Sequence, residues 1–98
     1  MSMYNPAHPG EILKELLISP MNISIREVAQ RLDISRNTLS KIINGKGSIT
    51  PEIAVRLELL FEKPSAEHWL RLQNSYDLWQ AKQHISDFRV VPLQTKMI

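Results

Sequence analysis

The chain contains, at residues 25–42, the sequence IREVAQRLDISRNTLSKI, whose pattern predicts two short helices joined by a tight turn. The two helices of such a motif cross closely, so one inward position on the first helix has to be small, and Ala29 meets this need. The other inward positions are all aliphatic: Val28, Leu32, Ile34, Leu39 and Ile42. The segment is therefore predicted to be a helix-turn-helix.

The turn between the two predicted helices has an aspartate where such turns usually have glycine. Glycine is common there because the backbone takes the left-handed conformation. Asp33 stands at this position, and aspartate is one of the few other residues that adopts this conformation with tolerable strain. The sequence departs from the usual pattern here without losing the motif.

Both helices of the motif have recognisable ends. Ser24 precedes the first helix and Glu27 follows three residues later, which is a capping box: each side chain is expected to bond the other residue's backbone N–H. Ser35 is the predicted cap of the second helix. Asn44-Gly45 is expected to close that helix, because both residues accept a left-handed backbone.

Three further helices are predicted from their first residues and their apolar stripes. One begins at His8-Pro9-Gly10-Glu11 and ends at Ser19-Pro20, a second begins at Thr50-Pro51, and the last runs from Pro64-Ser65 to about residue 83. The stripes are Ile12, Leu13, Leu16 and Leu17 in the first, Ile53, Ala54, Leu57, Leu60 and Phe61 in the second, and Trp69, Leu72, Tyr76 and Trp79 in the last. The expected fold class is all-α, with five helices.

A length of 98 residues allows one domain with one core. We expect that domain at residues 1–83, with the helix-turn-helix at residues 25–43, followed by a tail at residues 84–98. Within the tail, residues 88–93 are predicted to be a short edge strand or disordered, because Pro92 argues against a central strand.

Composition excludes several classes of protein. The absence of cysteine excludes disulfides and thiolate metal sites. The first ten residues, MSMYNPAHPG, lack the basic and apolar regions of a secretion signal. The longest apolar runs are too short to cross a bilayer, so a cytoplasmic protein is expected.

The positive charge is concentrated in one segment. Residues 22–50 hold five basic and two acidic residues, whereas residues 51–98 hold six of each. A basic face is what a phosphate-binding surface needs, although a solvated helix face would give the same counts.

The outward residues of the second motif helix have the chemistry of a DNA-reading surface. Each can donate a hydrogen bond and none is acidic: Ser35, Arg36, Asn37, Thr38, Ser40 and Lys41. Arginine and lysine suit the guanine edge and asparagine suits adenine. The predicted DNA contacts also include Ser24 and Arg26 before that helix, and Lys46 and Ser48 after it. The alternative is an ordinary helical hairpin with a polar face.

The chain resembles the HigA-type antitoxins, also called virulence-associated protein I-like regulators. The resemblance covers about residues 8–83. Its residues are His8-Pro-Gly-Glu-Ile-Leu13, Ser35-Arg-Asn-Thr-Leu-Ser40, Asn44-Gly45, Ile49-Thr-Pro-Glu-Ile-Ala-Val-Arg-Leu57 and Trp69-Leu-Arg-Leu-Gln-Asn-Ser-Tyr-Asp-Leu-Trp79. The resemblance implies a repressor-like (lambda repressor-like) five-helix fold and a homodimer. It also implies binding to a palindromic operator, repression of the protein's own operon, and neutralisation of a HigB-type toxin, an mRNA endonuclease.

The aromatic stripe of the last helix has two possible roles. Trp69, Leu72, Tyr76 and Trp79 are spaced for helix-on-helix packing, which fits either the domain's own core or a dimer interface. Core packing is the competing assignment for Trp69 and Leu72. Tyr76 and Trp79 lie further along the helix, where aromatic residues are good interface anchors.

No catalytic residues, metal ligands or cofactor are predicted. His8, His68 and His84 lack metal-ligand spacing, and the sequence Gly45-Lys46-Gly47 lacks the strand and spacing of a phosphate-binding loop. Two alternatives to a DNA-binding antitoxin stay open. One is a plain helix-turn-helix repressor without a toxin, and the other is an antitoxin that acts chiefly by binding protein.

Overall fold

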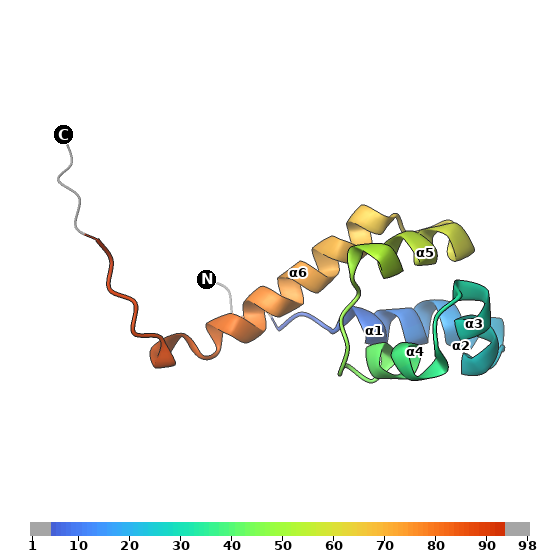
Figure 1. Cartoon of the computed structure of the whole chain (residues 1–98), viewed down its shortest axis with the longest axis horizontal. Helices are drawn as coiled ribbons and strands as arrows, with labels where there is room; N and C mark the ends of the chain where they lie inside the picture. The colour runs from blue at the N-terminus through green and yellow to red at the C-terminus, as the bar shows by residue number, and fades with distance from the viewer. Residues whose placement is uncertain (1–4, 94–98) are drawn as a thin grey trace.

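The computed structural model describes residues 5–93 and shows an all-α fold, as predicted (Figure 1). The first predicted helix is a continuous run of α1 (Pro9–Ile12), a π-helical turn (Leu13–Ile18) and α2 (Ser19–Met21). The motif helices are α3 (Ile25–Leu32) and α4 (Arg36–Ile43). They are followed by α5 (Pro51–Phe61), α6 (Ala66–Lys82) and a 3-10 turn (Ile85–Asp87).

The first helix differs from its prediction in length and in the face that it buries. It passes through Pro20 and ends at Met21, with Asn22 in the left-handed conformation at φ 58°. A proline ring clashes with the carbonyl four residues earlier in a regular α-helix, and the wider π turn before Pro20 relieves that conflict. Because that turn changes the register, Leu13 and Ile18 are buried, whereas Leu16 is 67% exposed, so its prediction as a member of the buried apolar stripe is wrong.

The core forms where the helix-turn-helix meets the other helices. The predicted inward residues Val28, Ala29, Leu32, Leu39 and Ile42 are all buried, and Ile34 packs against them half-buried. The cluster is completed by Leu13, Ile18, Ile49, Ala54, Leu57 and Trp69. The inward position predicted for the small residue Ala29 is therefore confirmed.

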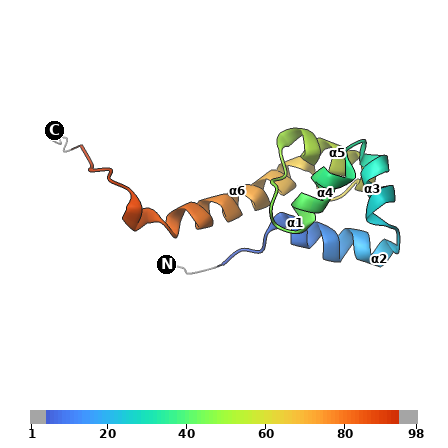
Figure 2. The ribbon, with the colours of Figure 1, turned by 60° about the horizontal axis from the view of Figure 1, so that its bottom comes forward.

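Helix α6 begins against α5 and then leaves the body as an arm (Figures 1 and 2). Beyond it, residues 88–93 form neither helix nor strand, so the edge strand, one of the two alternatives for this segment, is wrong. They are exposed, with Val90 at 82% and Leu93 at 92%. A strand needs a partner for its backbone groups, and the described chain provides none here.

Candidate nucleic-acid interface

The N-terminal end of α4 is fixed by a reciprocal cap. The Ser35 hydroxyl accepts a hydrogen bond from the Thr38 backbone N–H at 3.0 Å and donates one to Thr38 Oγ1 at 2.8 Å. The single hydroxyl hydrogen of Ser35 is therefore used inside the protein. The Thr38 hydroxyl accepts from Ser35, which leaves its own hydrogen free to donate outward.

The side chains of Arg36, Asn37 and Lys41 project from α4 into solvent. Among the described residues, none of the three makes a side-chain hydrogen bond or ion pair. The side chains of Arg26, Lys46 and Ser48 are exposed in the same way, and Ser24 is exposed at the start of α3, where its hydroxyl accepts the Glu27 N–H at 3.1 Å. The structure thus leaves most of the predicted DNA-contacting side chains available to a ligand.

The other end of α4 is closed by a local network. The Asn44 side-chain amide donates to the Ser40 carbonyl at 2.8 Å and to the Ser40 hydroxyl at 3.3 Å. Gly45 then takes the left-handed conformation at φ 77°, while Asn44 does not. Ser40 is half-buried, and its hydroxyl hydrogen is not used in this contact.

Arg31 differs from the exposed basic residues because it is already paired. Its guanidinium lies 2.8 Å from the Glu27 carboxylate, one helical turn earlier on α3. Glu27 therefore does not return to the cap of its own helix, and only the Ser24 half of the predicted capping box forms. A hydrogen bond to the charged Arg31 guanidinium is stronger than one to a neutral backbone N–H, so the Glu27 carboxylate turns to Arg31.

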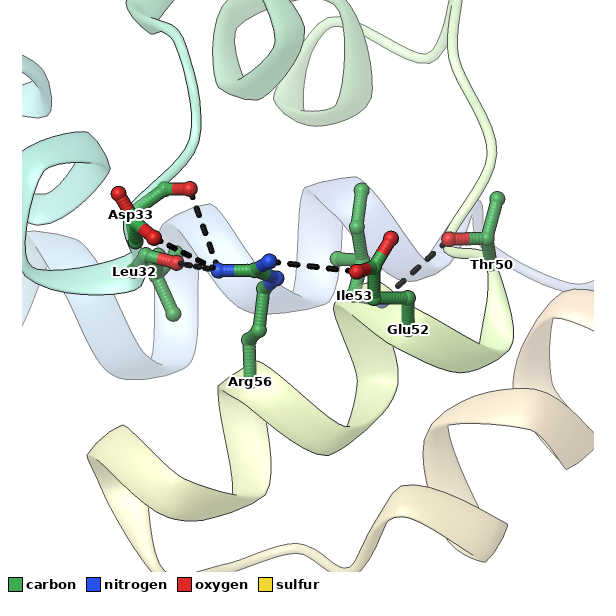
Figure 3. A network of polar contacts seen from close by, with 6 residues as sticks. All are labelled: Leu32, Asp33, Thr50, Glu52, Ile53 and Arg56. Carbon is green, nitrogen blue, oxygen red and sulfur yellow. Dashed lines mark hydrogen bonds and ion pairs between the residues drawn. The ribbon is translucent and has the colours of Figure 1, made fainter.

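The turn of the motif is held from α5 by Arg56 (Figure 3). Asp33 has the left-handed conformation predicted for this position, at φ 59°. The Arg56 guanidinium donates to the Leu32 carbonyl at 2.9 Å and to the Asp33 carbonyl at 3.2 Å, and its other nitrogen lies 3.3 Å from the Glu52 carboxylate. Arg56 thus satisfies carbonyls at the end of α3 that no helical N–H reaches.

We expect Arg56→Ala to lower the free energy of unfolding by about 2 kcal/mol, because it removes charge-assisted bonds to the turn. Arg56→Lys should recover only part of this loss, since one ammonium cannot reproduce the planar set of donors. Urea denaturation measures both. Arg31→Ala is the control: its exposed pair should change stability by less than about 0.5 kcal/mol. A lysine variant as stable as the wild type would contradict this role of Arg56.

Gln73 links the loop after α4 to α6, and the sequence reasoning missed it. Its side chain is buried, its Oε1 accepts the Ile49 backbone N–H at 2.8 Å, and its Nε2 donates to Asp77 at 2.9 Å. The signal was available, because Gln73 follows Trp69 by four residues and therefore shares its buried face. The loop that carries Lys46 and Ser48 is fixed to α6 by this contact.

His8 caps α1, as its position before that helix suggested. Its Nδ1 accepts the Gly10 N–H at 2.9 Å. Its ring packs edge-on against Tyr76 of α6, with the ring centroids 4.7 Å apart. Gly10 lies so close to the Ile42 carbonyl that there is no space for a side chain. These contacts with α4 and α6 are not predictable from the residues around His8, because their partners lie far away in the chain.

The aromatic stripe of α6 divides between two environments. Trp69 is fully buried in the core, so it offers no surface to a second chain, and Leu72 packs half-buried against that core. Trp69 therefore packs in the domain's own core, which was the alternative to a dimer contact. Tyr76 and Trp79 lie on the arm and are half-buried, in a pocket with Asn5, Pro6, Ala7 and His8 of the same chain. Of the four predicted interface residues, Trp69 is fully buried, and the other three keep part of their surface exposed.

Within residues 5–93, no three His, Cys, Asp or Glu side chains are arranged to hold a metal ion. None of the helices in that range combines the length and apolar character needed to cross a membrane.

Comparison with known proteins agrees with this geometry. Residues 13–68 match the helix-turn-helix family model. Virulence-associated protein A of Dichelobacter nodosus is 45% identical over 95% of this chain and 90% of its own length. Antitoxin HigA-1 of Vibrio cholerae is 33% identical over 84% of this chain and 76% of its own.

Solved structures give the same result. Pseudomonas aeruginosa antitoxin HigA, whose structure is with the higBA promoter, superposes with a TM-score of 0.76 at 32% identity. The match covers 91% of this chain and 99% of that one. The chain belongs to the helix-turn-helix family and, within it, to the HigA-type antitoxins and virulence-associated protein regulators.

Proposed function

We propose that this protein is a DNA-binding antitoxin that binds its own operator as a dimer, represses its operon and neutralises a HigB-type toxin. The observation that carries the DNA part is the exposed face of α4, where Arg36, Asn37 and Lys41 have no partner among the described residues. Buried or paired side chains cannot read bases, and these are neither. The P. aeruginosa relative with its promoter supports the same assignment.

In this proposal the outward face of α4 enters the major groove. Arg36 and Lys41 donate to guanine edges, and Asn37 pairs with adenine. Thr38, whose hydroxyl hydrogen is free, donates to a base or a phosphate. The phosphate backbone is contacted on one side by Ser24 and Arg26 and on the other by Lys46 and Ser48.

Fluorescence anisotropy tests this function directly. The probe is a duplex from the region upstream of the coding sequence, compared with a scrambled duplex over a salt series. Selective binding that weakens as salt rises is expected, because phosphate contacts release counterions. Equal binding to the two duplexes, or no binding, would remove the DNA role.

We place the dimer interface on the arm of α6. Tyr76 and Trp79 contribute aromatic surface, and three large apolar side chains nearby are exposed: Leu78 at 50%, Ile85 at 62% and Phe88 at 54%. Apolar surface of this kind on a projecting element favours burial against a second copy. Two-fold pairing of the arms would set two α4 helices one DNA turn apart, about 34–36 Å.

Trp79→Ala is expected to weaken self-association by at least about tenfold, because aromatic anchors dominate interface energies. Sedimentation equilibrium measures the change. Leu59→Ala is the matched control, since Leu59 is 77% exposed but lies on α5, on the globular body away from the arm (Figure 1). If both variants associate as the wild type does, the interface lies elsewhere.

Toxin neutralisation is supported by the similarity to antitoxin HigA-1 of Vibrio cholerae. Co-expression with the product of the adjacent reading frame tests it. Capture of that product as a complex, with rescue of growth, is the expected result. If the adjacent product neither binds nor arrests growth, the protein is a plain helix-turn-helix repressor.

A further inference from the structure

We propose that His8 and Gln73 are positioning residues that fix α4 relative to the α6 arm, and that they thereby set the spacing of the DNA half-sites that the dimer accepts. This inference rests on the proposed dimeric binding to DNA. Neither side chain is assigned a contact with DNA or with a partner chain.

The first attachment is the Gln73 contact. Its amide oxygen accepts the N–H of Ile49, in the loop that leaves α4, at 2.8 Å. Gln73 and Ile49 are both buried, 5% and 2% exposed, so removal of the acceptor leaves a buried N–H without its partner. The Gln73 Nε2 also donates to the Asp77 carboxylate at 2.9 Å, one turn further along α6.

The second attachment runs through His8. Its ring packs on Tyr76 of α6 and also lies beside the end of α4, because a methyl group on Gly45 would meet the ring at 3.9 Å. The same imidazole accepts the Gly10 N–H, and Gly10 is seated on the Ile42 carbonyl of α4. Helix α1 thus lies between α4 and α6 and contacts both.

The two attachments act on the same segment, the loop that follows α4. Both hold the loop that follows α4, through Gly45 and Ile49, to positions 73 and 76 of α6. The core already joins the two helices, because Trp69 of α6 packs in the same cluster as Leu39 and Ile42 of α4. The two attachments add to this packing at the end of α4 and so restrict its direction relative to the arm.

The direction of α4 matters because the arm is the proposed dimer element. Each base pair advances the duplex by about 3.4 Å, so a small tilt of α4 on its arm is enough to change the register of one half-site against the other. A rigid dimer has to twist or bend DNA whose spacing is wrong, at a cost in affinity. A dimer with loosened attachments adapts by moving the protein.

Two variants remove the attachments selectively. His8→Asn keeps a side-chain acceptor for the Gly10 N–H, since asparagine is a good cap, but removes the ring that packs on Tyr76. Gln73→Met keeps a similar volume but removes the acceptor for Ile49. Thr50→Ala is the control, because it weakens the cap of α5, where Thr50 Oγ1 accepts the Ile53 N–H at 3.3 Å, without touching either attachment.

The test measures dissociation constants of the purified proteins by anisotropy on the operator, mapped by footprinting upstream of the coding sequence. Three duplexes are compared: the natural operator, one with a base pair inserted between the half-sites, and one with a single half-site. The wild type and Thr50→Ala should bind the duplex with the inserted base pair with about tenfold or more lower affinity than the natural operator. His8→Asn and Gln73→Met should lose about threefold or less in affinity for the duplex with the inserted base pair. Their affinity for the single half-site should equal that of the wild type.

Variants that discriminate spacing as strongly as the wild type would overturn the inference. So would variants that lose single-half-site affinity in proportion to full-site affinity, because the residues would then serve the fold alone. A wild-type protein that binds none of the duplexes selectively would instead remove the proposed function itself, and that result is distinct from the other two.

Discussion

Gly10→Ala is expected to destabilise the protein by at least about 3 kcal/mol, a large part of the stability of a domain of this size. The reason is steric: a Cβ at this position would lie far inside the contact distance of the Ile42 backbone carbonyl. A backbone atom cannot rotate away as a flexible side chain can, so α1 would have to separate from α4. Urea denaturation followed by circular dichroism measures the loss.

Gly45→Ala is the matched control, because it adds the same methyl group at a glycine that faces the His8 ring. Space is available there, with the nearest atom at 3.9 Å, and only the φ of 77° opposes the side chain. The expected cost is therefore about 1–2 kcal/mol, the price of a left-handed alanine. A Gly10→Ala protein as stable as the Gly45→Ala protein would show that α1 and α4 are not pressed together as the structure has them.

The local features of this fold could be predicted from the sequence because their causes are local. Ser24, Ser35, Thr50 and Ser65 each precede a helix, and each hydroxyl accepts the N–H three residues later. The left-handed Asp33 follows from the turn that it occupies. Such features need only the residues within one helical turn, and these are visible in the sequence.

Features that depend on distant residues were missed or wrong. Gln73 bonds a residue 24 positions away, and Arg56 reaches Leu32 over the same separation. A single sequence does not show which distant carbonyl or N–H lacks a partner. Regular helical spacing predicts Leu16 on the buried face, and the π turn breaks that spacing. The exposed face of α4 was easier to recognise, because a reading surface requires free polar side chains on a regular helix.

The double variant Arg36→Ala/Lys41→Ala is expected to lose at least about a hundredfold in affinity for the operator, because each base contact contributes about 1–3 kcal/mol. Both side chains are exposed on α4 and unpaired among the described residues, so their removal leaves the fold intact. Anisotropy on the operator and on scrambled DNA measures the affinity, and thermal denaturation checks stability. Asn37→Ala should relax the preference for one base pair without a change in the salt dependence.

Arg31→Ala separates a positional effect from a simple effect of charge. It removes the same residue type and the same charge as Arg36→Ala, but the Arg31 guanidinium is held by Glu27 at 2.8 Å on α3. It should change operator affinity by less than about threefold, because an ion pair releases few counterions on binding DNA. If Arg31→Ala and Arg36→Ala weaken binding equally, the protein attracts DNA by its overall charge. If only the α4 variants do so, and partner capture persists in them, α4 is the recognition helix and the protein-binding activity resides on another surface.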